Sequence, residues 1–236
     1  MKAIVQREFA SYFNTMVGYI FVAICMLVCG VFFTSTNIIG GSASFTSVIS
    51  SVSYALILIT PILTMRSFAE ERKSKSDQLL LTAPVSIPSI VLGKYLSALL
   101  VLAVTLGATL VFPVALAIFG EPYWSEILLG YIGMALLGGT FIAIGLFVSA
   151  VSESQLTACI STLGLLFFFW LSDSLIPSLT NQTLLAILKA LSLYGQFSAF
   201  TNGVLNLSTI VYFLSVTFLF LFFTVKAVER RRWSKN

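Results

Sequence analysis

Six apolar stretches, each long enough to cross a lipid bilayer, constrain the fold of this 236-residue chain more than any other feature. A transmembrane helix needs about 20 predominantly apolar residues. Phe, Leu, Ile and Val run here in unbroken blocks without period-2 alternation, which favours helices over the strands of a barrel. The predicted spans are residues 17–36, 48–65, 95–119, 127–150, 156–175 and 209–227. We therefore predict an all-α polytopic membrane protein with a single domain, residues 1–236.

Composition excludes the other broad classes of protein. Hydrophobic residues make up 58% of the chain and charged residues only 9%, whereas soluble domains are about 25% charged. So few charges cannot cover a water-facing surface of this size. The chain has no histidine, and its three cysteines lie inside apolar runs. Histidine-based catalysis and histidine-ligated metals are therefore excluded, and we expect no catalytic, cofactor or metal site in this chain.

The basic residues predict how the chain is oriented. With a cytoplasmic N-terminus, the cytoplasmic segments hold twelve of the 13 Lys and Arg residues, and the opposite side holds only Lys189. Cytoplasmic loops of membrane proteins carry an excess of Lys and Arg. Both chain ends are then cytoplasmic, which agrees with an even number of spans.

Residues 1–16 carry one apolar stripe at helical spacing. Its members are Val5, Phe9, Tyr12, Phe13 and Met16. A helix with one apolar and one polar face lies in the plane of a membrane surface. We predict an interfacial helix on the cytoplasmic leaflet before the first span.

The longest cytoplasmic segment, residues 66–94, has the charge pattern of a helix. Opposite charges stand four residues apart in three pairs: Arg66/Glu70, Glu71/Lys75 and Lys73/Asp77. Pro84 then disfavours helix at Ala83, and Ser86 with Pro88 is typical of a new helix start. We predict that the second span continues into the cytoplasm, turns sharply and returns as the third. The charged helix is either a solvated loop or a docking surface for a soluble partner.

Two prolines fall inside predicted spans, Pro61 in 48–65 and Pro113 in 95–119. Proline lacks an N–H and clashes with the carbonyl four residues earlier. We predict a kink in each helix, either fixed or able to bend during function.

Two further segments have recognisable patterns. In the span 127–150, small residues recur every four positions at Ala135, Gly139 and Ala143, which indicates close helix packing within one subunit or at a dimer face. In the external segment 176–208, the stretch 183–193 is apolar but too short to cross. We predict that it forms a short re-entrant or interfacial helix.

An energy source for transport is not found in the chain. The only Gly-Lys pair, Gly93-Lys94, is followed by Tyr95 and has Pro88 where a P-loop needs its first glycine. Ion-coupled carriers usually place an ionisable residue deep in the bundle, and the predicted spans have none at mid-depth. Any active transport must therefore be driven by another subunit.

Two stretches resemble the permease subunits of ABC-2 type ABC exporters. Residues 70–86, EERKSKSDQLLLTAPVS, continuing to VLGKY at 91–95, are similar to the family segment E-x-x-x-x-T/S-x-x-x-L-L-x-x-P-V/I-S between the second and third helices. Residues 193–206, LYGQFSAFTNGVLN, and the tail ERRRW at 229–233 resemble a bacterial subgroup that includes gliding-motility-associated and nitrous-oxide-reductase maturation permeases. The chain departs from this subgroup at Asn206, where an acidic residue is expected.

The resemblance implies a dimer of permease subunits, the same or related, in the bacterial cytoplasmic (inner) membrane. Two ABC ATPase subunits would dock from the cytoplasm and hold the ATP and Mg, so that this chain is not itself an enzyme. Residues 1–16 would be a connecting helix and residues 66–94 the coupling segment. The expected ATPase contacts are Glu70, Glu71, Arg72, Lys75, Asp77, Thr82 and Pro84. A periplasmic auxiliary protein is a further expected partner, and nucleic acid is not.

Two other functions fit the same sequence features. A membrane scaffold would transmit ATPase motion to an external partner without moving a substrate across the membrane. A carrier working alone would be passive or ion-coupled and would need no ATPase.

Overall fold

The computed structural model describes residues 2–73, 86–120, 122–176, 188–189 and 191–233. These residues are helical and contain no strand, which confirms the predicted fold class. Six helical segments are long and apolar enough to span a membrane. They are α2 (Val17–Phe33) with the π-helix η1 (Thr34–Ile39), α3 (Thr46–Thr64) with α4 (Arg66–Lys73), α6 (Ile87–Thr109) with α7 (Val111–Phe119), α8 (Trp124–Val151), α9 (Gln155–Leu175) and α12 (Leu207–Trp233). Two further helices are α1 (Lys2–Asn14) and α11 (Leu193–Thr201).

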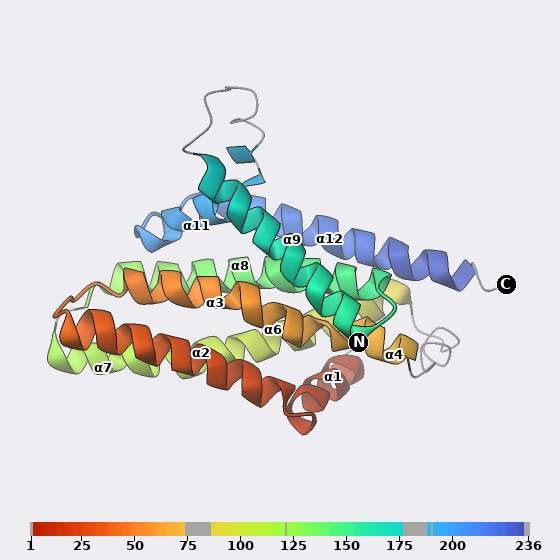
Figure 1. Cartoon of the computed structure of the whole chain (residues 1–236), viewed down its shortest axis with the longest axis horizontal. Coiled ribbons are helices and arrows are strands. Elements are labelled where there is room, and N and C mark those ends of the chain that lie inside the picture. The colour runs from red at the N-terminus through yellow and green to blue at the C-terminus, as the bar shows by residue number, and fades with distance from the viewer. Residues whose placement is uncertain (1, 74–85, 121, 177–187, 190, 234–236) are drawn as a thin grey trace.

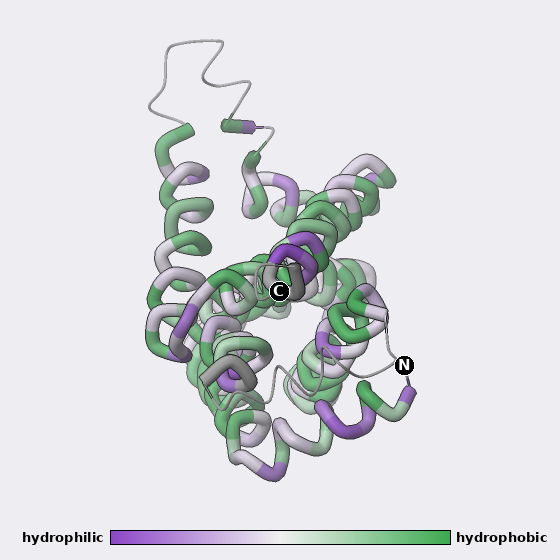
Figure 2. Tube along the Cα trace, turned by 90° about the vertical axis from the view of Figure 1, so that its right-hand side faces the viewer, coloured by the Kyte–Doolittle hydropathy of each residue, from purple (hydrophilic) through white to green (hydrophobic). Residues whose placement is uncertain are grey.

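Helix α8 is the central helix of the bundle. It contacts α3, α6, α9, α11 and α12. Of the residues in its most apolar stretch 72% are buried, against 22% of those in the corresponding stretch of α9. Figure 1 shows α8 between the other long helices, with α9 crossing them at an angle. Seen from the end of the bundle, α9 lies at one edge (Figure 2).

Glycines on α8 explain how so many helices approach it. A Cβ atom would meet a side chain of α3 at Gly130 and Gly145, of α11 at Gly133, and of α6 at Gly138. Small residues of this kind let helix backbones come close together in a membrane. These four glycines therefore allow α3, α6 and α11 to pack closely against α8 within the chain.

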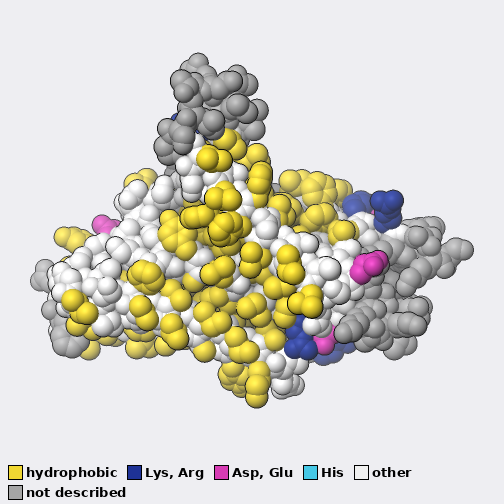
Figure 3. Space-filling view, in the orientation of Figure 1, with side chains coloured by type: hydrophobic (Ala, Val, Ile, Leu, Met, Phe, Trp, Pro, Cys, Tyr) yellow, Lys and Arg dark blue, Asp and Glu magenta, His cyan; other side chains and the backbone are white. Residues whose placement is uncertain are grey.

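Charged residues divide the bundle into two ends. Helix α1, helix α4 and the last turns of α12 lie together at what we call the basic end (Figures 1 and 2). The opposite end is formed by η1, the end of α7, and α11. Figure 3 shows apolar side chains over the whole length of the face between them, with Lys and Arg gathered at the basic end. A lipid-facing surface accounts for this distribution.

The two prolines have different surroundings. Helix α3 runs from Thr46 to Thr64 with Pro61 inside it. The third span is instead interrupted at Leu110, between α6 and α7, one turn before Pro113. Pro113 has no N–H to donate to the carbonyl of Thr109, which accounts for a break at that place. Bending of either helix during function stays a prediction.

The segment between α9 and α12 contains a helix at a place that the sequence analysis did not anticipate. The predicted short helix 183–193 falls largely outside the described residues. Helix α11 starts at Leu193 because two side chains cap it: Asp173 Oδ2 accepts from the N–H of Tyr194 at 2.8 Å, and Ser192 Oγ accepts from that of Gly195 at 2.9 Å. Asn206 in turn caps α12, since its Oδ1 accepts from the N–H of Ser208 at 3.2 Å.

Candidate functional site

The candidate site is the first turn of α4, where the second span leaves the bundle at the basic end. Arg66 and Glu70 form the predicted i,i+4 pair, with Nε–Oε2 and Nη2–Oε1 distances of 2.7 and 2.9 Å. A paired, two-point contact of this kind is more specific than a single ion pair. The other two predicted pairs involve residues whose side chains lie outside the described part of the chain.

Ser149 of α8 caps the start of α4. The first N–H groups of any helix lack partners within the helix itself. Here the Ser149 hydroxyl oxygen accepts from the N–H groups of Phe68 and Ala69 at 3.2 and 3.3 Å and donates to the carbonyl of Met65 at 3.2 Å. Ser149 is fully buried. The helix cap therefore comes from a neighbouring span, which joins the α3–α4 junction to the centre of the bundle.

Tyr12 of α1 makes a second contact with the same turn. Its phenol oxygen lies 3.2 Å from the hydroxyl oxygen of Ser67, and both side chains are buried. The amphipathic stripe of α1 packs mainly against α6, with Phe9 and Phe13 against the hydrophobic core and Ile4 over Gly93. The predicted stripe is therefore covered largely by protein, and Met16 is not part of it, because Met16 is 70% exposed.

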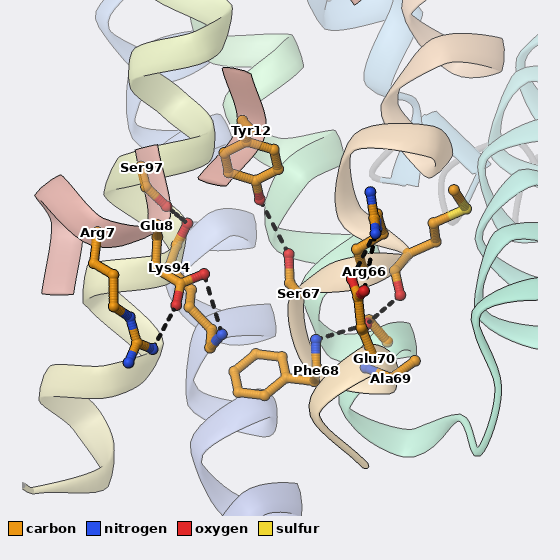
Figure 4. A network of polar contacts seen from close by, with 12 residues as sticks. Arg7, Glu8, Tyr12, Arg66, Ser67, Phe68, Ala69, Glu70, Lys94 and Ser97 are labelled. Atoms are coloured by element: carbon orange, nitrogen blue, oxygen red, sulfur yellow. Dashed lines mark hydrogen bonds and ion pairs between the residues drawn. The ribbon is translucent and has the colours of Figure 1, made fainter. Parts of the chain in front are cut away.

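Lys94 of α6 makes the third contact. Its ammonium lies 3.3 Å from Glu8 Oε2 on α1 and 5.2 Å from the centre of the Phe68 ring on α4. Arg7 also pairs with Glu8, at 2.9 Å. Figure 4 shows these residues converging from three helices. The first turn of α4 is thus attached to α1, α6 and α8 by polar contacts.

The burial of Lys94 was not predicted. Lys94 was assigned to the cytoplasmic segment 66–94, directly before the span predicted from residue 95, and the structure places it in α6, which begins at Ile87, with only 1% of it exposed. The predicted helix start at Ser86 and Pro88 was correct, since Ser86 has extended backbone at the N-cap and the proline follows in the first turn. A hydropathy pattern cannot show that a lysine is paired with a residue far away in the sequence.

The expected ATPase contacts divide into three groups. Glu70 is described in full and is partly exposed on α4. Glu71 and Arg72 lie on the same helix, but only their backbone is described. Lys75, Asp77, Thr82 and Pro84 lie outside the described residues. Within the described part of the chain, no three His, Cys, Asp or Glu side chains gather in a way that could hold a metal.

Fold and site together define a multi-pass helical membrane protein in which a charged extension of one span is firmly attached to the bundle. Residues 42–229 match the family model described as ABC-2 family transporter protein. Because this match covers more than half of the chain, the protein belongs to the ABC-2 family of transporters. A search of curated proteins finds no match. Family membership supports a membrane permease of an ABC exporter, a component that is generally non-catalytic and that implies a partner ATPase.

Proposed function

We propose that this protein is the membrane-embedded permease subunit of an ATP-driven ABC-2 exporter. A separate ATPase subunit binds ATP and Mg and hydrolyses the nucleotide, and the permease converts the resulting motion into export. Two permease subunits form the membrane part of the complex.

The basic end is proposed to be cytoplasmic, in a bacterial inner membrane. Nearly all Lys and Arg residues fall in segments that lead to this end, and positively charged segments are retained on the cytoplasmic side. Both termini, α1 and α4 are then on the side where ATP is available.

The observation that carries the proposal is the attachment of α4. A charged helix that continues a span and makes polar contacts with three other helices can transmit a rigid-body displacement. If its attachment were loose, a push from an ATPase would bend the α3–α4 junction and would not reach the bundle. The contacts of Ser149, Tyr12 and Lys94 prevent that bending. The ATPase contact is proposed at Glu70, Glu71, Arg72, Lys75, Asp77, Thr82 and Pro84.

Co-purification with an ABC ATPase tests the proposal. The permease is co-expressed with candidate ABC ATPases, and complex formation and ATP hydrolysis are measured for the wild type and for Glu71→Lys and Asp77→Lys. Charge reversal should weaken assembly and reduce stimulated hydrolysis, because it places like charges against the partner. Glu126→Lys, a reversal at the opposite end, should leave both unchanged. Unchanged assembly and coupling in the Glu71 and Asp77 variants would refute the contact, and the absence of any ATPase partner would refute the function.

A further inference from the structure

Lys94 is a buried lysine in α6, which together with α7 is long and apolar enough to span a membrane, and its position needs an explanation. It lies about two turns after the start of α6 at Ile87, and 1% of it is exposed. A buried ammonium is unfavourable unless it is paired and hydrogen-bonded. Glu8 provides the pairing carboxylate at 3.3 Å, and the face of the Phe68 ring provides a second favourable contact at 5.2 Å.

Stability alone does not account for a charge at this position. Buried ion pairs are weak evidence for stability, because well-packed apolar residues of similar size are often equally good. What an ion pair adds is directionality, since the ammonium must meet both partners at once. Lys94 therefore fixes the position of α1 and of the first turn of α4 relative to α6.

Neighbouring contacts restrict the same three helices. A Cβ on Gly93 would lie 2.8 Å from Ile4 Cγ2, so a larger residue at position 93 would force Ile4 of α1 to shift away from α6. The Tyr12–Ser67 contact joins α1 to α4 directly. Figure 4 shows Lys94 between these elements. With Lys94 in place, α1, α4 and α6 are connected in every pairwise combination.

We infer that Lys94 is a positioning residue for coupling, which makes α1, α6 and the first turn of α4 move as one body. The inference rests on the proposed function and assigns it a route: displacement of α4 passes through Lys94 to α6, which continues through α7 to the opposite end of the bundle. Without the ammonium, α4 would still meet its ATPase, but its displacement would no longer be passed fully to α6.

The test separates assembly from transmission. A spin label is placed at the opposite end through Ile118→Cys, an exposed site on α7, in a Cys159→Ser background. Cys25 and Cys29 stay unlabelled because they are buried. The electron paramagnetic resonance spectrum of the permease–ATPase complex is compared without nucleotide and with Mg-ATP plus vanadate. Lys94→Met removes the charge and keeps an apolar chain, and Lys226→Met removes an exposed ammonium from an ion pair within α12.

Lys94→Met should bind the ATPase within about threefold of the wild-type affinity and lose most of the nucleotide-dependent spectral change. Lys226→Met should keep both. Glu8→Gln, which keeps the shape of the carboxylate, should lose part of the change and provides a second variant if Lys94→Met does not fold.

Two results would overturn the inference but not the proposed function. One is a full nucleotide-dependent spectral change in both Lys94→Met and Glu8→Gln. The other is that these variants lose ATPase binding to the same extent as they lose the spectral change. A wild-type complex without any nucleotide-dependent change would instead overturn the proposed function, and the inference with it.

Discussion

The phenol oxygen of Tyr12 lies 3.2 Å from the hydroxyl oxygen of Ser67, although 55 positions separate the two residues in the chain. This contact joins the N-terminal helix to the first turn of α4. It is one of three polar contacts, each from a different helix, that attach this turn to the bundle. Four predictions follow from these contacts and from the packing around them.

Removing the Tyr12 hydroxyl should loosen α1. Tyr12→Phe keeps the ring but leaves the buried Ser67 hydroxyl without this partner, so the free energy of unfolding should fall by about 1 kcal/mol. Thermal unfolding in detergent should show an apparent Tm lower by about 3 °C. Tyr19→Phe is the matched control, because Tyr19 is exposed on α2, and its Tm should not change. Equal effects at the two tyrosines would contradict the role of the hydroxyl contact.

Removing the Ser149 hydroxyl should have a larger effect. Ser149→Ala leaves the N–H groups of Phe68 and Ala69 without their acceptor in a buried place. Each such orphaned group costs about 1–3 kcal/mol. Because two N–H groups are affected, the free energy of unfolding should fall by about 2 kcal/mol or more. Amide hydrogen exchange in the first turn of α4 should accelerate in the same variant.

Ser97→Ala is the control for this prediction. Ser97 is as fully buried as Ser149, but it donates only to the carbonyl of Lys94 in its own helix, at 2.8 Å. That carbonyl lies in a helix interior, where the backbone N–H of residue 98 is available to it. The loss should therefore be small. If Ser97→Ala destabilised as much as Ser149→Ala, capping of α4 would not be the reason for the effect.

Local patterns in the sequence were enough to predict much of this structure. The six spans follow from apolar runs, the start of α6 from Ser86 and Pro88, and the Arg66–Glu70 pair from i,i+4 spacing. In each case the residues involved are neighbours in the chain, so their interaction depends on the geometry of one helix only.

The contacts of the candidate site could not be predicted in this way. Glu8 and Lys94 belong to different helices, and so do Phe68 and Ser149, so that only the three-dimensional packing brings them together. Helix α11 was missed in part for the same reason, since one of its two caps, Asp173, comes from the preceding span, although the other, Ser192, is local. A single buried lysine near a helix start resembles a loop lysine in any hydropathy profile.

Backbone strain at the α1–α2 junction gives a third prediction. Met16 has φ of 61°, in the left-handed region that disfavours side chains with a Cβ. Met16→Gly relieves about 1–2 kcal/mol of steric strain and loses about 0.5–1 kcal/mol through the flexibility of the unfolded chain. The net effect should be a small rise in stability. Met16→Val should lower stability, because β-branched residues tolerate this region poorly.

The same pair of substitutions at Leu27 provides the comparison. Leu27 is also exposed, but it lies inside α2 with ordinary helical backbone. In a helix interior glycine is less stable than alanine by about 1 kcal/mol, and valine lies between them. Leu27→Val should therefore be more stable than Leu27→Gly. The ranking of Gly and Val in thermal unfolding should therefore reverse between positions 16 and 27. An unchanged ranking would mean that the junction is not strained.

Two glycine-to-alanine substitutions should have effects of opposite sign. A Cβ on Gly145 of α8 would overlap the side chain of Thr64 on α3, whereas a Cβ on Gly164 of α9 would meet nothing within 4 Å. Overpacking of a close helix contact costs about 1–3 kcal/mol, and alanine in an open helical position gains about 1 kcal/mol over glycine. Gly145→Ala should therefore lower the apparent Tm in detergent, and Gly164→Ala should raise it.

Thr64 is the last residue of α3, directly before the junction with α4, so Gly145→Ala should also accelerate amide exchange in the first turn of α4. A rise in Tm for both variants would show that α3 and α8 can separate without loss, and that the central packing of the bundle is looser than the contact at Gly145 requires.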